Sequence, residues 1–381
     1  MIPSTASRCV GALVLAMLLA VTACARATPD ERRARAVTEP AVRAAGDLRT
    51  ERVVADLAGP TQMIFGPDGR VWLAQLNGGE DDGRGQVLAV DLDGGERELL
   101  LDGLDKPTGI AWLDGSLWIA TRDAVLRARG DPPGEPEVVV AGLPSNGRSN
   151  GTLTPTPDGR LLYETSGRLR RNGGVVERSG TLWELDPADP DDPTVVATGF
   201  KNAYAHVFDG SGALWSTEIA EPIGGAEPPD ELNRIERGAD YGWPACVGDR
   251  RPVESVGVAA EDPPDVGGDP QRCEDTVAPV AEFGPGATAT SVVVSPFDDD
   301  AFIVALWAAG KVVSVAADGS GEPTALVSGL TRPQHLLIDR DTVLVSDHAG
   351  GTIHRITADR SVPPAVGGRA RYGDQETKGR T

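Results

Sequence analysis

The sequence is poor in positive charge, in helical patterning and in long apolar segments. It has 36 Lys and Arg residues against 57 Asp and Glu residues, which gives a formal net charge of −21. This charge argues against binding to nucleic acid or to an anionic membrane and favours neutral or cationic partners. The apolar run at residues 10–21 is shorter than the roughly 20 residues that a membrane-spanning helix needs. Helical periodicity is almost absent, so a helical bundle is not expected.

The N-terminus has the order of residues found in a secretory signal peptide. Arg8 precedes the apolar run, and small residues stand directly before Cys24. That arrangement is what the bacterial lipoprotein peptidase requires, so residues 1–24 are predicted to be a lipoprotein signal and Cys24 the lipid-bearing residue. An ordinary signal peptide with an incidental cysteine is the alternative. If Cys24 carries lipid, the protein is exported and held on the outer face of the bacterial membrane, which it touches only through this lipid.

The remaining chain divides by composition. Residues 25–50 are rich in Arg, Ala, Glu and Thr without apolar periodicity, which predicts a disordered tether. Residues 361–381 are predicted to be a disordered tail. One large domain is left at residues 51–360, expected to act as a monomer.

The chain has four cysteines, of which Cys9 and Cys24 belong to the signal region. Cys246 and Cys273 remain, and the segment between them is rich in Pro, Gly and Asp. In an oxidising compartment, such a pair is expected to form a disulfide rather than a metal site.

One phrase recurs along the domain, an Asp-Gly turn followed by a short apolar strand that often contains Trp. The clear copies lie at residues 67–75, 113–121, 157–165 and 209–217, and weaker copies lie at 299–306 and 339–347. Each copy sits among further short strands, for example a third strand at 85–90 and fourth strands at 99–104, 138–143, 195–200 and 325–330. This spacing predicts four-stranded antiparallel sheets.

Six copies predict an all-β, six-bladed β-propeller. The last unit lacks a fourth strand, and residues 52–57 match the fourth-strand phrase, so this N-terminal segment is expected to complete the last blade and close the ring. A seven-bladed ring or an open sandwich is the alternative.

In a propeller, the loops that enter each blade and those that join its second and third strands meet on one face, where binding residues are expected. The candidates in the entry loops are Gln62, Thr108, Arg148, Ser149, Asn150, Lys201, Asn202, Thr288, Arg332, Gln334 and His335. The candidates in the second class of loops are Asn77, Arg122, Glu218, Trp307, Asp347 and His348.

The most distinctive stretch is Asp-Glu-Leu-Asn at 230–233 followed by Gly-Ala-Asp-Tyr-Gly-Trp-Pro at 238–244, with Gly-Phe-Lys-Asn at 199–202 before it. Here the chain resembles the PQQ-dependent glucose/sorbosone dehydrogenase family, over roughly residues 52–358. The resemblance implies an aldose substrate, a PQQ cofactor with Ca²⁺, and hydride transfer from the anomeric carbon to the quinone. Because the chain has no C-x-x-C-H haem motif, the electron acceptor would be a separate molecule.

The resemblance also implies roles for individual residues. Lys201, which stands where the family usually has Arg, would stabilise the charge of the reduced quinone, and Asn202 would hydrogen-bond the cofactor. Arg332 would contact its carboxylates, and Gln62 and Arg148 are further candidate cofactor contacts. Backbone oxygens between Glu218 and Asp230 would bind Ca²⁺. The candidate metal or loop-stabilising residues are Glu218, Asp230, Glu231 and Tyr241.

The chain departs from the family at the catalytic base. The family has a histidine shortly before the glycine matched by Gly151, whereas residues 147–150 here are Gly-Arg-Ser-Asn, and arginine is no base at neutral pH. His335 is therefore a candidate substitute base. Two other functions remain open, a propeller that has lost the oxidation step and binds a ligand or protein at the cell surface, and a calcium-dependent lactonase.

Overall fold

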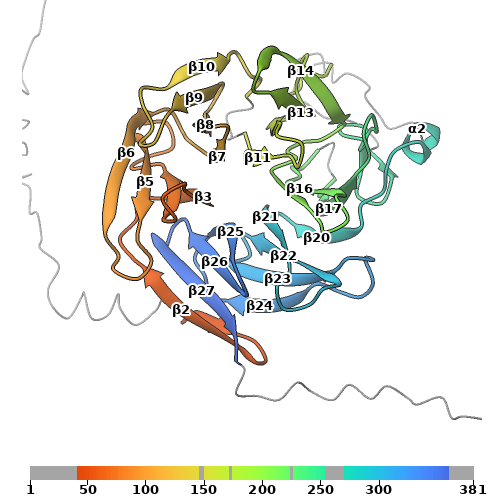
Figure 1. Ribbon diagram of the computed structural model, residues 1–381. Coiled ribbons are helices and arrows are strands. Elements are labelled where there is room, and N and C mark those ends of the chain that lie inside the picture. Colours follow the sequence, from red (N-terminus) through yellow and green to blue (C-terminus); the bar gives the residue numbers. More distant parts are fainter. Residues whose placement is uncertain (1–40, 146–149, 171–173, 224–225, 254–269, 360–381) are drawn as a thin grey trace, which may run out of the picture. The chain divides into compact units, whose positions relative to one another are not determined.

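The computed structural model describes residues 41–145, 150–170, 174–223, 226–253 and 270–359. These residues form six antiparallel blades arranged in a ring (Figure 1), which confirms the predicted all-β, six-bladed propeller. Five blades have four strands each, and one has a short fifth strand at its edge. The helix α2 (Pro270–Glu274) is the only α-helix in the described ranges. No helix there is long and apolar enough to cross a membrane.

The blades follow one another in chain order. Blade one contains β3 (Pro60–Phe65), β4 (Val71–Gln75), β5 (Gly85–Val90) and β6 (Arg97–Leu104), and blade two contains β7 (Gly109–Leu113), β8 (Ser116–Ala120), β9 (Val125–Arg129) and β10 (Glu137–Val140). Blade three contains β11 (Thr154–Pro155), β12 (Leu161–Thr165), β13 (Thr181–Asp186) and β14 (Asp189–Thr198), and blade four contains β15 (Ala205–Phe208), β16 (Leu214–Glu218), β17 (Pro229–Ile235) and β20 (Ala281–Pro285). Blade five contains β21 (Ala289–Val294), β22 (Ala301–Leu306), β23 (Lys311–Ala316) and β24 (Thr324–Ser328), and blade six contains β25 (Pro333–Asp339), β26 (Thr342–Asp347), β27 (Thr352–Ala358) and β2 (Leu48–Val54).

The repeated Asp-Gly-Trp phrase has a structural basis in two of the blades. The Asp68 carboxylate accepts hydrogen bonds from the Arg70 backbone N–H at 3.0 Å and from the Trp72 indole at 3.1 Å. Asp209 does the same for Trp215, whose indole lies 2.8 Å from Oδ2. The Asp thus fixes the turn and pairs the one polar atom of a buried Trp, which would otherwise be left unsatisfied.

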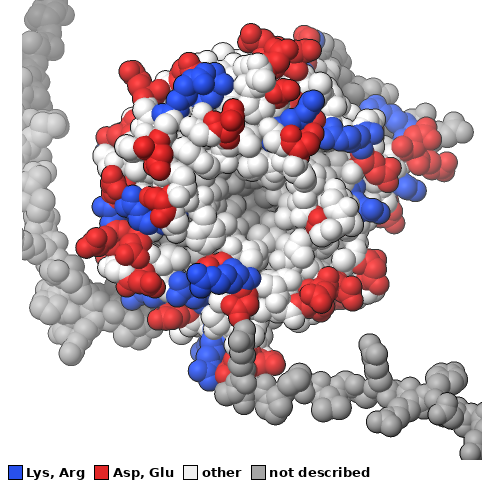
Figure 2. Space-filling model, in the orientation of Figure 1, with Lys and Arg blue, Asp and Glu red and all other residues white. Residues whose placement is uncertain are grey.

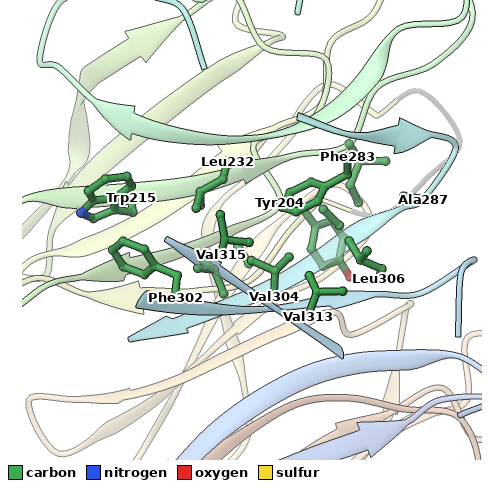
Figure 3. Packing of buried hydrophobic residues seen from close by; sticks show 14 residues of the cluster. Tyr204, Trp215, Leu232, Phe283, Ala287, Phe302, Val304, Leu306, Val313 and Val315 are labelled. Atoms are coloured by element: carbon green, nitrogen blue, oxygen red, sulfur yellow. The ribbon is translucent and has the colours of Figure 1, made fainter. Parts of the chain in front are cut away.

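The core lies between neighbouring blades. Trp215 of blade four packs on Phe302 of blade five, with ring centroids 4.4 Å apart. Leu232 and Phe283 from blade four complete this cluster together with Val304 from blade five (Figure 3). A separate apolar cluster of this kind lies between each pair of neighbouring blades around the ring.

The two ends of the domain share the last blade. Strand β2 pairs with β27, with Leu48 opposite Ala358 and Arg52 opposite His354. It therefore supplies the outer strand of blade six from the N-terminal side, although it begins four residues before the segment that the sequence pattern selects.

The predicted tether boundary at residue 50 is wrong. The short strand β1 (Arg43–Ala44) pairs with β24, and β2 already begins at Leu48. Val42, Ala44 and Leu48 are partly buried against the core between blades five and six, so their apolar side chains hold this segment on the ring.

Blade four carries an insertion between β17 and β20. It contains the hairpin of β18 (Cys246–Val247) and β19 (Arg251–Pro252), followed by α2. Cys246 and Cys273 form the predicted disulfide. The bond ties the segment after the Tyr-Gly-Trp-Pro turn to α2.

Candidate active site on the channel face

The loops that enter each blade and those between second and third strands lie at the same end of the blades, because neighbouring strands are antiparallel. The ring is hollowed at its centre (Figure 2). Two hydrogen bonds tie non-neighbouring blades near this centre: the Gln62 amide nitrogen donates to the Leu153 carbonyl at 2.9 Å, and the Gln334 amide nitrogen donates to the Tyr204 hydroxyl at 2.7 Å.

Lys201 is held at the entry of blade four by a buried carboxylate. The backbone N–H groups of Lys201 and Asn202 donate to the two oxygens of Glu218, at 2.5 and 3.3 Å. The Lys201 side chain is largely buried, and its ammonium lies 3.0 Å from the Glu221 carboxylate. The turn that carries Lys201 is therefore fixed, and the charge of Lys201 is balanced by the partly exposed carboxylate of Glu221.

A second cation lies at the entry of blade six. The exposed guanidinium of Arg332 stacks on the Trp307 ring, 3.8 Å from its centroid. The backbone N–H groups of Thr331 and Arg332 both donate to the Asp347 carboxylate at 2.7 Å. Asp347 thus fixes the loop while the guanidinium stays accessible.

The loop after β4 contacts blade two through ion pairs. The Lys106 ammonium contacts Glu80 at 2.6 Å, with its own side chain almost fully buried. Arg122 contacts Asp81 at 2.6 Å and Asp105 at 3.0 Å. Glu80 is mostly exposed, so a carboxylate of blade one stands on the channel face.

Four buried carboxyl groups surround the blade-three and blade-four loops. Burial raises the pKa of Glu164 to about 8, that of Glu231 to about 7 and that of Asp230 to about 6. Burial, together with the charges of Glu231 and Glu164, raises the pKa of Glu218 well above its ordinary value. Desolvation disfavours the charged form of each group.

These groups predict that the folded protein loses stability as the pH rises. Above the ordinary pKa of 4.5 for glutamate, the unfolded chain releases protons that the folded chain keeps up to the raised pKa, at a cost of about 1.4 kcal/mol per pH unit for each group. Glu164→Gln is expected to remove one such contribution between about pH 4.5 and pH 8. Urea unfolding at pH 5, 6, 7 and 8 measures it.

Glu322 offers a matched control, because its side chain is exposed. Glu322→Gln should leave the slope of unfolding free energy against pH as in the parent chain. An equal slope in the Glu164→Gln chain and the parent would contradict the raised pKa of Glu164.

The residues predicted to hold a metal or to stabilise the loop form hydrogen bonds with the backbone in this structure. Asp230 accepts from the Ala220 and Ala289 N–H groups at 2.9 and 3.0 Å, and Glu231 accepts from the Gly248 N–H at 2.8 Å. The Tyr241 hydroxyl donates to the Arg234 carbonyl at 2.7 Å. Within the described ranges, no group of three or more His, Cys, Asp or Glu could hold a metal ion.

Of the other candidates, two are buried and hydrogen-bonded to the backbone, and two lie outside the described residues. Gln62 is buried, and its amide bonds the backbone of Ile110 and Leu153, so its side chain ties three blades together. His335 is buried, and its Nδ1 accepts the Met63 N–H at 3.3 Å. Arg148 and Cys24 lie outside the described residues.

The sequence pattern did not identify Glu164 or Glu221 as candidate site residues. Glu164 Oε1 accepts the Gly151 N–H at 2.9 Å and the Ser166 hydroxyl at 3.2 Å, so it fixes the loop beside the departure from the family pattern. A signal was present, because Ala74 and Ala120 occupy the equivalent place in the first two copies of the repeat. A carboxyl group at a position that otherwise carries a small buried residue indicates a special role.

Comparison with known proteins supports the resemblance seen in the motifs. Residues 165–331 match the family model described as Glucose / Sorbosone dehydrogenase. This range contains Lys201, Asn202 and the Asp-Glu and Tyr-Gly-Trp-Pro segments. No curated protein matches the chain.

Solved structures share the fold. The PQQ-bound form of aldose sugar dehydrogenase from Streptomyces coelicolor is 16% identical with a TM-score of 0.62, covering 83% of this chain and 99% of that one. The soluble aldose sugar dehydrogenase from Escherichia coli, in the apo form, is 17% identical with a TM-score of 0.64, covering 82% and 99%. A calcium structure of a Trichoderma reesei enzyme of Carbohydrate-Active Enzymes Family AA12 is 16% identical with a TM-score of 0.67, covering 84% and 98%. The resemblance to the glucose/sorbosone dehydrogenase family is thus confirmed in motif and in fold.

Proposed function

We propose that this protein is a sugar dehydrogenase that oxidises an aldose at the channel face of the propeller, with PQQ as the cofactor. The observation that carries the proposal is the pair of cations at the entries of blades four and six. Lys201 and Arg332 stand at the positions that the resemblance assigns to cofactor contacts, and both face the same end of the ring.

The donor set fits an anionic planar ligand. The guanidinium of Arg332 is accessible and suits a bidentate contact with a carboxylate, and its stacking on Trp307 holds it in place. Lys201 would supply a positive charge where the reduced quinone gathers negative charge. When bound, the cofactor supplies a two-electron acceptor for the hydride of the sugar.

The described side chains do not form a carboxylate cage for calcium. The acids Glu218, Asp230 and Glu231 already accept backbone hydrogen bonds, and burial raises their pKa values. Any calcium ion that accompanies the cofactor would therefore be bound by backbone oxygens, as the resemblance implies.

We also propose that the protein is exported and carries lipid on Cys24, that its substrate is a small sugar, and that its electrons pass to a separate acceptor. The signal-like order of residues 1–24 and the absence of a haem-attachment motif support these parts of the proposal.

The test uses the purified full-length chain. PQQ is titrated with and without Ca²⁺ while the absorbance of the cofactor is followed, and the reduction of an artificial dye is then measured with a panel of aldoses. Saturable binding with sugar-dependent dye reduction is the expected result. A folded chain that binds no PQQ at micromolar concentration would overturn the proposal and favour a propeller that binds a ligand or protein without oxidation.

A further inference from the structure

The proposed oxidation needs a group that accepts the proton of the sugar hydroxyl, and the histidine expected from the family is missing. The chain has four histidines, and all four lie in described parts of the structure. A proton acceptor must have a ring nitrogen with a free lone pair, and that nitrogen must be reachable by a ligand.

Three of the histidines fail. His335 is buried, and because a backbone N–H can only donate, the 3.3 Å contact from Met63 occupies the lone pair of Nδ1 and puts the ring proton on Nε2. Both ring nitrogens of His206 are buried without a partner. His354 is buried in β27, opposite Arg52 of the outer strand.

His348 meets both requirements. It follows β26 in the loop on the channel face and is half-buried. Its Nδ1 lies 3.1 Å from the Pro60 carbonyl oxygen. Since a carbonyl oxygen can only accept, Nδ1 must carry the proton, and Nε2 keeps its lone pair.

The position of the His348 ring is fixed by its neighbours. The ring packs on Gly59, where an added Cβ would lie 3.1 Å from Cε1. The His348 backbone N–H donates to the Arg332 carbonyl at 2.8 Å, so this histidine is joined to the loop that carries the proposed carboxylate-binding guanidinium. The imidazole therefore stands beside the proposed cofactor contact rather than elsewhere on the ring.

Charged groups around the ring act in both directions. Burial lowers the pKa of His348 below its ordinary value, the contact with the Pro60 carbonyl and the charges of Glu80 and Asp347 oppose this shift, and the charge of Arg332 adds to it. The net result is a neutral imidazole at neutral pH, the form that can accept a proton.

We propose that Nε2 of His348 is the proton acceptor of the reaction, an inference that rests on the proposed function. The O–H bond of the anomeric hydroxyl breaks and its proton passes to Nε2. The C–H bond of the anomeric carbon would break in the same reaction. Bound PQQ would supply the two-electron acceptor for the hydride, so that the sugar would leave as a lactone.

The first experiment measures His348→Gln in the PQQ-loaded full-length chain. Loss of an acid–base catalyst is expected to lower kcat with a saturating aldose by about 100- to 10,000-fold. The affinity for PQQ should stay within threefold. The decrease of kcat at acidic pH, which protonation of the imidazole causes in the parent chain, should disappear. His354→Gln is the matched control and should retain the parent rate, because its ring lies in the body of blade six.

A second readout needs no cofactor. Diethyl pyrocarbonate modifies neutral, accessible histidines, and one fast-reacting histidine is expected in the parent chain and in His354→Gln but none in His348→Gln. If the parent chain oxidises aldoses and His348→Gln does so within threefold, the inference fails while the proposed function stands. If the fast-reacting histidine survives in His348→Gln, another imidazole is the accessible one and the inference fails. A parent chain that oxidises no aldose overturns the proposed function, and the role of His348 with it.

Discussion

Gly199→Ala is expected to destabilise the protein by at least about 3 kcal/mol. Gly199 has a φ of +82°, and an added Cβ would lie 2.0 Å from the Asp240 carboxylate and 2.6 Å from the Gly242 backbone nitrogen. The Tyr-Gly-Trp-Pro segment packs against this residue, since the Trp243 N–H donates to the Gly199 carbonyl at 2.8 Å. A methyl group cannot be added without moving backbone that the disulfide-linked insertion holds in place. Urea unfolding measures the loss.

Gly103→Ala provides the matched control. Gly103 has a similar φ of +71°, but nothing lies within 4 Å of its added Cβ. It should therefore show only the cost of a left-handed backbone, about 1 kcal/mol. Equal losses in the two variants would mean that close packing at Gly199 adds nothing and that backbone strain alone requires glycine there.

The propeller could be predicted from the sequence because its main determinants are local and repeated. The Asp-Gly turn and the following Trp lie within seven residues of each other, as in Asp209 and Trp215, and the structure joins them directly. Six copies of a local signal define six blades. The disulfide was likewise predictable, because only two of the four cysteines, Cys246 and Cys273, lie within the repeat-bearing domain.

The start of the domain could not be predicted, because its signal is weak and its partner distant. Arg43 pairs with Ser328 and Leu48 with Ala358, and the few apolar residues near residue 42 show no clear period in a segment rich in Arg and Ala. Such a strand is fixed by tertiary contacts rather than by its own propensity.

The side chains of the candidate site were predictable only in part. The pattern identified the loops, and Lys201 and Arg332 lie on the expected face. It did not reveal that Asp230 and Glu231 bond backbone N–H groups, nor that Met63 occupies Nδ1 of His335. These contacts join residues as many as 272 positions apart, and a local pattern carries no information about them.

Lys201→Met is expected to lower kcat/KM for aldose oxidation by about 100- to 1,000-fold, the usual effect of removing one group that stabilises developing charge. The substitution removes the ammonium and keeps most of the apolar stem. The backbone of the turn should stay in place, because Glu218 binds the N–H groups of residues 201 and 202 rather than the side chain. Dye-coupled kinetics with PQQ-loaded protein measure the effect.

Two further variants separate charge from structure. Lys201→Arg keeps the positive charge and should retain activity within about tenfold, since guanidinium also pairs with carboxylates. Arg129→Ala removes an exposed cation that pairs with Glu137 at 3.0 Å, at the far end of blade two from the entry loops, and should leave the rate unchanged. If Lys201→Met and Arg129→Ala had equal rates, the cation at the entry of blade four would take no part in the reaction. The negative charge that builds up during oxidation would then have to be stabilised from blade six, where Arg332 is the accessible cation.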